Sequence, residues 1–147
     1  MTMAAPHPSK DTLKYWLDKV KEEDDRVYTQ IPLFAENNSE QARRIVSLIY
    51  DRIRELDIKP TADSDSIRLR YYYVLDAILK KQKGKFVSAF EDTVLPRFPE
   101  EMDKARSNPQ LLKSLLELLT SWEGLLGMNH LNACLKKFYS IPPILVQ

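Results

Sequence analysis

Apolar residues recur every three or four positions along most of this sequence, and that spacing restricts the fold more than any other feature. The longest stripe consists of Ala42, Ile45, Val46, Ile49, Ile53 and Leu56. Side chains at these intervals lie on one face of an α-helix, because the helix has about 3.6 residues per turn. No segment is predicted as a β-strand. The pattern therefore predicts an all-α domain.

Three predicted helices occupy the first part of the chain. The first should cover about residues 10 to 22. A short second helix follows, and Pro32 fits only in its first turn because proline has no backbone N–H to donate. The cluster Asn37-Asn38-Ser39 should end this helix and start the next. The third helix carries the long stripe and should end before Lys59-Pro60.

Polar residues and glycine set the limits of the next two helices. Ser64, Asp65 or Ser66 can cap the fourth helix, because their side-chain oxygens accept bonds from free N–H groups at a helix start. The fourth helix should stop near Gly84. Apolar residues between 86 and 94 predict a fifth helix.

Prolines mark two of the remaining starts. Pro99 predicts a short sixth helix, and Asn108 followed by Pro109 predicts the seventh. The apolar face of the seventh helix should comprise Leu112, Leu115, Leu116, Leu119 and Trp122. Asn129 can cap an eighth helix.

These elements predict one domain, in which eight helices pair and stack as a right-handed solenoid-like bundle. It should cover residues 10–140. A flexible segment is expected at 1–9 and an extended tail at 141–147, where two consecutive prolines exclude a helix. A length of 147 residues suits one domain with one core.

Composition excludes several classes of function. The 22 basic and 21 acidic residues nearly cancel, so no overall field points to nucleic acid. Only three glycines occur and none forms a phosphate-binding loop, while His7 and His130 are too few and too far apart for a recognisable metal site or triad. We therefore expect no catalysis, no cofactor and no metal.

Cysteine usage and hydropathy bear on the compartment. Cys134 is the single cysteine, which excludes an internal disulfide and a cysteine-based zinc site and fits a reducing compartment. No apolar run approaches the roughly 20 residues that span a bilayer, and the first ten residues lack the apolar core of a secretory signal. We expect an intracellular protein with a packed thiol and no membrane partner.

A carboxylate, Asp76, stands in the otherwise apolar fourth helix. The core face of this helix should comprise Ile67, Tyr71, Val74, Leu75 and Ile78. The opposite stripe comprises Leu69, Tyr73, Asp76 and Lys80. Asp76 can pair with Lys80 on a solvated face, accept a hydrogen bond beside Tyr73 in a groove for an extended peptide, or satisfy the core as a buried group. The pattern alone leaves all three interpretations open.

A resemblance to a known family bears on this choice. The segments YYVLDAILKK, LFAENNSEQARRIVSLI, FEDTVLPRF and LLTSWEGL resemble the CTD-interacting domain, an eight-helix module of transcription-termination, polyadenylation and splicing-associated factors. The resemblance covers about residues 10 to 140. Its most specific part is Tyr73-x-x-Asp76-x-Ile78, and Trp122 also fits in order and spacing.

The resemblance implies a ligand. Members of the family bind the heptad-repeat tail of RNA polymerase II, Tyr-Ser-Pro-Thr-Ser-Pro-Ser, as an extended segment that ends in a β-turn. Carried over, it implies that Tyr73 lines the groove and that Asp76 accepts a hydrogen bond from the turn of the peptide. Leu69 and Lys80, on the same stripe, are expected to contact the peptide as well.

The sequence departs from the family at the usual phosphate position. Glu117, five residues before Trp122, stands where many members carry an arginine or lysine. A carboxylate repels a serine phosphate, which carries about −1.5 to −2 charges near neutral pH. Lys81 replaces a frequent asparagine, and Glu22-Glu23-Asp24-Asp25-Arg26 replaces an Asn-Ser-Lys-like segment.

Four lysines gather where the fourth helix ends, at positions 80, 81, 83 and 85. Lysines suit a solvated surface and the negative end of a helix dipole. The alternatives are a displaced phosphate site at Lys81, Lys83 and Lys85, or contact with RNA phosphates. The tyrosines at 71 to 73 point in three directions on a helix, so we expect Tyr71 in the core rather than a stacking surface for bases. Trp122 is also expected in the core.

The leading hypothesis is a monomeric, nuclear, non-catalytic module that binds the polymerase tail and couples transcription to RNA 3′-end processing, termination or splicing. One alternative is a related membrane-trafficking adaptor of the VHS or ENTH type, whose lysine cluster would bind phosphoinositides or whose groove would bind sorting peptides. The other is a degenerate member of the family that serves only as a protein-interaction scaffold.

Overall fold

A computed structural model describes residues 10–141, and within this range the chain is helical, with no strand and one isolated β-bridge between Glu123 and Leu126. The α-helices are α1 (Lys10–Val20), α2 (Val27–Asn37), α3 (Ala42–Ile58), α4 (Ser64–Gln82), α5 (Gly84–Thr93), α6 (Phe98–Lys104), α7 (Pro109–Ser121) and α8 (Met128–Ser140). Short 3-10 turns lie at Ser39–Gln41, Leu95–Arg97 and Ala105–Ser107. The all-α class is confirmed. The predicted flexible segment 1–9 and residues 142–147 of the predicted tail lie outside the described residues.

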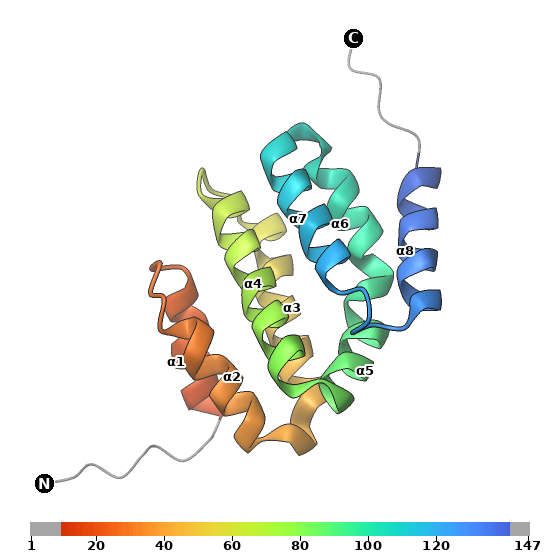
Figure 1. The fold of residues 1–147 in the computed structure, drawn as a ribbon. Helices are drawn as coiled ribbons and strands as arrows, with labels where there is room; N and C mark the ends of the chain where they lie inside the picture. The colour runs from red at the N-terminus through yellow and green to blue at the C-terminus, as the bar shows by residue number, and fades with distance from the viewer. Residues whose placement is uncertain (1–9, 142–147) are drawn as a thin grey trace, which may run out of the picture.

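The helices lie side by side, and α7 stands between α4 and α6 (Figure 1). The α3 and α4 helices lie in the middle, with α1 and α2 on one side and α5, α6 and α7 on the other, while α8 stands at the far edge. The α4 helix packs against α2, α3, α5 and α7, and α8 packs mainly against α6. This arrangement makes α4 a central helix that contacts both halves of the molecule.

The buried surface of α4 is wider than one stripe. Tyr71, Val74, Leu75 and Ile78 are buried as predicted, whereas Ile67 is only half-buried. Tyr72 and Leu79 are buried as well. The hydroxyl of Tyr71 donates to the carbonyl of Leu17 at 2.9 Å. Tyr72 could not be placed from the apolar pattern, because helices on several sides of α4 bury residues that an amphipathic helix would leave exposed.

Trp122 is a core residue, as predicted. Its side chain is fully buried, and its ring lies 4.8 Å from that of Phe90 and 5.5 Å from that of Phe98, centroid to centroid. Cys134 is also buried as expected, and burial raises the pKa of its thiol to about 12. The ring contacts of Trp122 with Phe90 and Phe98 connect α5, α6 and the end of α7.

Two predicted helix starts are wrong. The α2 helix begins at Val27, so Pro32 lies in its interior rather than in its first turn. Val27, Ile31 and Pro32 are all buried, and that packing outweighs one missing backbone hydrogen bond. The α8 helix begins at Met128, with Gly127 at the cap position predicted for Asn129.

The cap of α4 differs from expectation, and its junction with α5 is very short. Asp63 occupies the cap position of α4, and Ser64, inside the helix, accepts a 2.7 Å bond from the N–H of Thr61. The α4 helix ends at Gln82, close to Gly84 as predicted; Gly84 begins α5, and Lys83 alone separates the two helices. Lys83 and Gly84 both have positive φ angles, 50° and 48°. The corner is therefore tighter than a helix stop followed by a loop.

The start of α7 matches its prediction, and its apolar face does so in part: Leu115, Leu119 and Trp122 are buried as predicted. The side chain of Asn108 accepts a 3.2 Å hydrogen bond from the N–H of Leu111, which makes Asn108 the N-cap. The buried residues of α7 are Leu111, Leu115, Leu118 and Leu119. Leu112 and Leu116 are only half-buried, and both line a cavity.

Candidate functional site

The second stripe of α4 lies between α2 and α7. Its most exposed aromatic residue is Tyr73, with 37% of its surface accessible, and Leu69 is half-buried against the core. On the α2 side, the ammonium of Lys81 lies 3.5 Å from a carboxylate oxygen of Glu36. On the α7 side, the ammonium of Lys80 donates to the hydroxyl of Ser121 at 3.2 Å. The structure thus brings Leu69, Tyr73, Asp76 and Lys80 together on one accessible face.

Asp76 is bound from two sides. The indole N–H of Trp122 donates to Oδ1 of Asp76 at 2.8 Å, and the ammonium of Lys80 lies 2.8 Å from the same oxygen. The Asp76 side chain is 17% exposed. The interpretation that Asp76 merely pairs with Lys80 on a solvated face is therefore wrong, since the carboxylate also satisfies a buried donor. Its second oxygen, Oδ2, has no hydrogen-bond partner among the described residues.

An aromatic residue of α2 adjoins this face and was missed from the sequence. Tyr28 lies on α2, which packs against α4, and burial raises the pKa of its phenol. Tyr28 is half-buried. It precedes the predicted start of its helix, so only the correct start at Val27 would have assigned it to a helix face.

The four lysines differ in their surroundings. Lys80 and Lys81 each face a carboxylate, Asp76 and Glu36 respectively. Lys83 and Lys85 are exposed and form no ion pair with any described residue. The structure gathers all four around the corner between α4 and α5, but only the last two are free of a neighbouring carboxylate.

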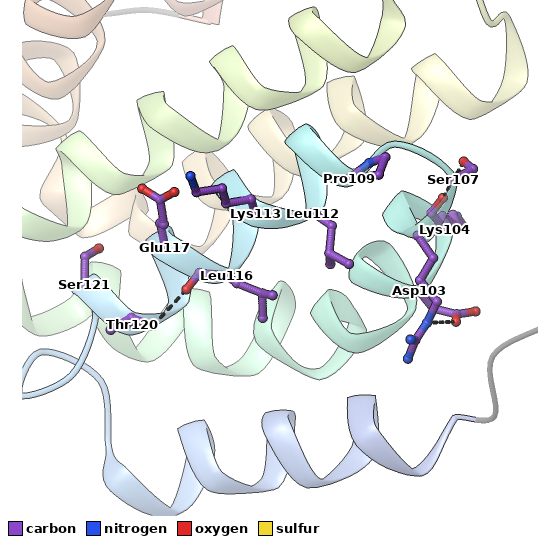
Figure 2. A pocket seen from close by; sticks show the side chains of 11 residues that line it. Asp103, Lys104, Ser107, Pro109, Leu112, Lys113, Leu116, Glu117, Thr120 and Ser121 are labelled. Atoms are coloured by element: carbon purple, nitrogen blue, oxygen red, sulfur yellow. Dashed lines mark hydrogen bonds and ion pairs between the residues drawn. The ribbon is translucent and has the colours of Figure 1, made fainter.

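A cavity of about 1290 Å³ lies along the outer side of α7 (Figure 2). Leu112 and Leu116 point to one side of the helix, and Lys113 and Glu117 point to the other. The full lining comprises Asp103, Lys104, Arg106, Ser107, Pro109, Leu112, Lys113, Leu116, Glu117, Thr120 and Ser121. Because Ser121 also accepts the bond from Lys80, the cavity begins beside the Asp76 face. Glu117 puts a carboxylate, not a cation, into that wall.

The described residues contain no group of three or more His, Cys, Asp or Glu side chains placed to hold a metal ion. Within residues 10–141, no helix combines the length and the apolar character that crossing a membrane requires. Comparison with known proteins gives no family either: no family model, no curated protein and no solved structure matches this chain.

Proposed function

We propose that this chain is a non-catalytic binding module whose α4 face takes an extended peptide, and that its ligand is the heptad-repeat tail of RNA polymerase II. One observation carries the proposal. Oδ2 of Asp76 has no partner among the described residues, and it lies on the same helix face as the exposed ring of Tyr73. A free acceptor beside an accessible aromatic ring is what an extended peptide with hydroxyl donors requires.

The chemistry of the heptad suits this face. Its tyrosine, serine and threonine side chains carry hydroxyl groups that can donate to Oδ2 of Asp76, and a hydrogen bond to a charged group is stronger than one between neutral groups. Its prolines and tyrosine offer apolar surface that Tyr73, Leu69 and Tyr28 can cover. Two proline residues per repeat also favour an extended backbone before binding, which lowers the entropy lost on ordering.

The arrangement of the helices supports a fold of the same kind. The pairs α1 with α2 and α3 with α4 lie side by side, and α5 to α7 continue the stack (Figure 1). We propose that the bundle is a right-handed solenoid of the CTD-interacting type, with eight helices when the short α6 is counted. Its place of action would be the nucleus, in an RNA-processing or termination factor.

Phosphorylation of the tail would meet different charges at different places. Glu117 repels a phosphate at the position that many family members use, so we propose that this module does not select a phosphate there. Of the four lysines at the end of α4, Lys83 and Lys85 are open to a phosphate elsewhere on the ligand, because Lys80 and Lys81 already face carboxylates.

Fluorescence anisotropy tests the proposal, with labelled two-repeat heptad peptides that are unmodified or phosphorylated at either main serine. We expect at least one of these peptides to bind, and we expect a peptide of the same composition with a scrambled sequence not to bind. Tyr73→Ala should weaken binding about 10-fold or more, whereas Tyr139→Ala, at an exposed tyrosine of α8, should not. Binding to anionic liposomes without binding to any heptad peptide would contradict the proposal and favour the trafficking adaptor.

A further inference from the structure

The Trp122 side chain connects the buried core to the accessible face of α4. Its ring is fully buried against Phe90 and Phe98. Its N–H leaves that core and reaches Asp76 on the accessible face of α4. The aromatic contacts fix the plane of the indole, so the direction of the N–H is fixed by the core and not by solvent.

The two donors on Asp76 converge on one atom. Both the Trp122 indole and the Lys80 ammonium lie 2.8 Å from Oδ1. A carboxylate oxygen has about two lone-pair directions, so two donors occupy Oδ1 and leave the acceptor capacity of Oδ2 unused. Lys80 is held on its other side by the hydroxyl of Ser121. The carboxylate therefore has one satisfied oxygen and one that is open.

The two donors also differ in rigidity. Lys80 is exposed, and its ammonium sits on a flexible stem, so it can leave Asp76 at little cost. Trp122 cannot turn without disturbing the core, and its buried N–H would lose its partner if the carboxylate rotated away. Trp122 is thus the donor that can hold one rotamer of Asp76.

From this geometry we infer that Trp122 is a positioning residue of the α4 site, which orients the Asp76 carboxylate so that Oδ2 meets a hydrogen-bond donor of the ligand. The inference rests on the proposed function, and it adds that the recognised group of the peptide is an O–H or N–H and not an acceptor. Trp122 itself does not touch the ligand.

Nuclear magnetic resonance on the free protein tests the positioning without any peptide. Asp76→Ala should move the indole N–H signal of Trp122 and leave that of Trp16, the only other tryptophan, in place. Three-bond couplings should show one χ1 rotamer for Asp76 in the native protein and averaged rotamers in Trp122→Phe. Lys80→Met should leave the single rotamer intact. An unmoved Trp122 signal, or a single Asp76 rotamer in folded Trp122→Phe, would overturn the inference.

A double-mutant cycle tests its effect on binding. Trp122→Phe keeps an aromatic ring in the core and deletes the N–H, so it should weaken heptad binding about 10-fold when Asp76 is present. In the Asp76→Ala background the same change should cost less than about 2-fold, because no carboxylate is left to orient. Equal losses in both backgrounds would mean that Trp122 acts only through stability and would overturn the inference.

The two arms separate this inference from the proposed function. If no heptad peptide binds the native protein, the proposed function fails, and the rotamer measurement alone decides whether Trp122 holds Asp76. If Trp122→Phe does not fold, the Asp76→Ala arm still reports the bond on the native indole, and its failure to move that signal would reject the inference.

Discussion

The indole N–H of Trp122 and the carboxylate of Asp76, 46 positions apart in the chain, are joined by a 2.8 Å hydrogen bond. The bond connects the core to the face of α4 where the proposed ligand lies. Asp76 therefore has two roles: it accepts the bond from Trp122 in the fold, and it accepts a bond from the proposed ligand. Substitution by Asn and by Ala should separate these roles.

Asp76→Asn should weaken heptad binding while changing stability little. The amide oxygen can still accept from Trp122, which turns the NH₂ group toward the ligand in place of Oδ2. Loss of a hydrogen bond to a charged group should cost about 1.5 to 3 kcal/mol of binding, or roughly 10- to 150-fold in affinity. The Lys80 pair contributes at most about 0.5 kcal/mol to stability. Peptide anisotropy and urea unfolding measure both.

Asp76→Ala should in addition destabilise the fold by about 1 to 3 kcal/mol, because it leaves the buried N–H of Trp122 without a partner.

The matched control for Asp76→Asn is Asp92→Asn on α5, which removes an exposed carboxylate paired with Arg43. Unchanged affinity in folded Asp76→Asn would defeat the peptide-groove interpretation.

Trp122→Ala should lower the free energy of unfolding by about 3 to 5 kcal/mol, because it opens a cavity among Phe90 and Phe98 and removes the bond to Asp76. Trp16→Ala, at a half-buried tryptophan of α1, should cost clearly less. Urea denaturation followed by circular dichroism gives both values. A loss under about 1 kcal/mol for Trp122→Ala would contradict its place in the core.

Charge reversal at Lys83 and Lys85 should affect phosphorylated peptide more than unmodified peptide. Both ammonium groups are exposed and lack a neighbouring carboxylate among the described residues, so a ligand phosphate is the anion that they can attract. Added salt should shrink the difference between the two peptides. Lys136→Glu, on the exposed side of α8, is the control. Equal effects on both peptides would leave the lysines as a general electrostatic feature.

Lys83→Gly should stabilise the protein by about 1 kcal/mol. Lys83 has φ 50° and ψ −148°, a backbone conformation in which a side chain is strained and glycine is not. The same substitution at Lys113, an exposed residue inside α7, should instead destabilise by about 0.5 to 1 kcal/mol. Thermal unfolding of the two variants should therefore shift in opposite directions. A destabilised Lys83→Gly would show that the corner is not strained.

Stability should fall as the pH rises above about 10. Burial raises the pKa of Tyr50 to about 12 and that of Tyr72 well above its ordinary value of 10.0. The unfolded chain releases these protons near pH 10 while the folded protein keeps them, so the stabilisation is complete below that pH and is lost above it. Urea unfolding at about pH 8 and about pH 10.5 measures the slope.

Tyr72→Phe should flatten this alkaline slope, because it removes one of the buried phenols. It should also cost about 1 kcal/mol at pH 8, since the hydroxyl donates to Glu101 at 3.3 Å. Tyr139→Phe, at an exposed position, is the control. Identical slopes for the native protein and Tyr72→Phe would exclude Tyr72 as a source of the pH dependence.

Local signals predicted much of this structure. Asn108 followed by Pro109 marked the start of α7, and the stripe from Ala42 to Leu56 marked α3, because both depend on interactions within a few residues. The start of α2 at Val27 was missed, because burial of its side chains and not a capping residue determines it.

Contacts between distant residues could not be predicted in this way. Periodicity correctly predicted Trp122 in the core and Asp76 on another face of its helix. It could not predict the hydrogen bond between the Trp122 indole and the Asp76 carboxylate. A buried cluster at the first half of α4 was missed for a similar reason. Arg68 and Glu101, whose side chains are only 10% and 3% exposed, are charged types that a sequence pattern assigns to the surface. Asp57, 2.8 Å from Arg68, makes their burial tolerable.

The corner at Lys83 fixes the position of α5 relative to α4. With one residue between α4 and α5, nothing can absorb a change in length there. One inserted residue would shift the start of α5 relative to α4 and would disturb the packing of Phe86 and Phe90, which are buried in the core. The distance from Asp76 to Lys85 is therefore set by helix geometry, and a ligand that spans both meets charges at a constant separation. Lengthening this corner by a single residue should disturb core packing and ligand spacing together, which a flexible loop would not do.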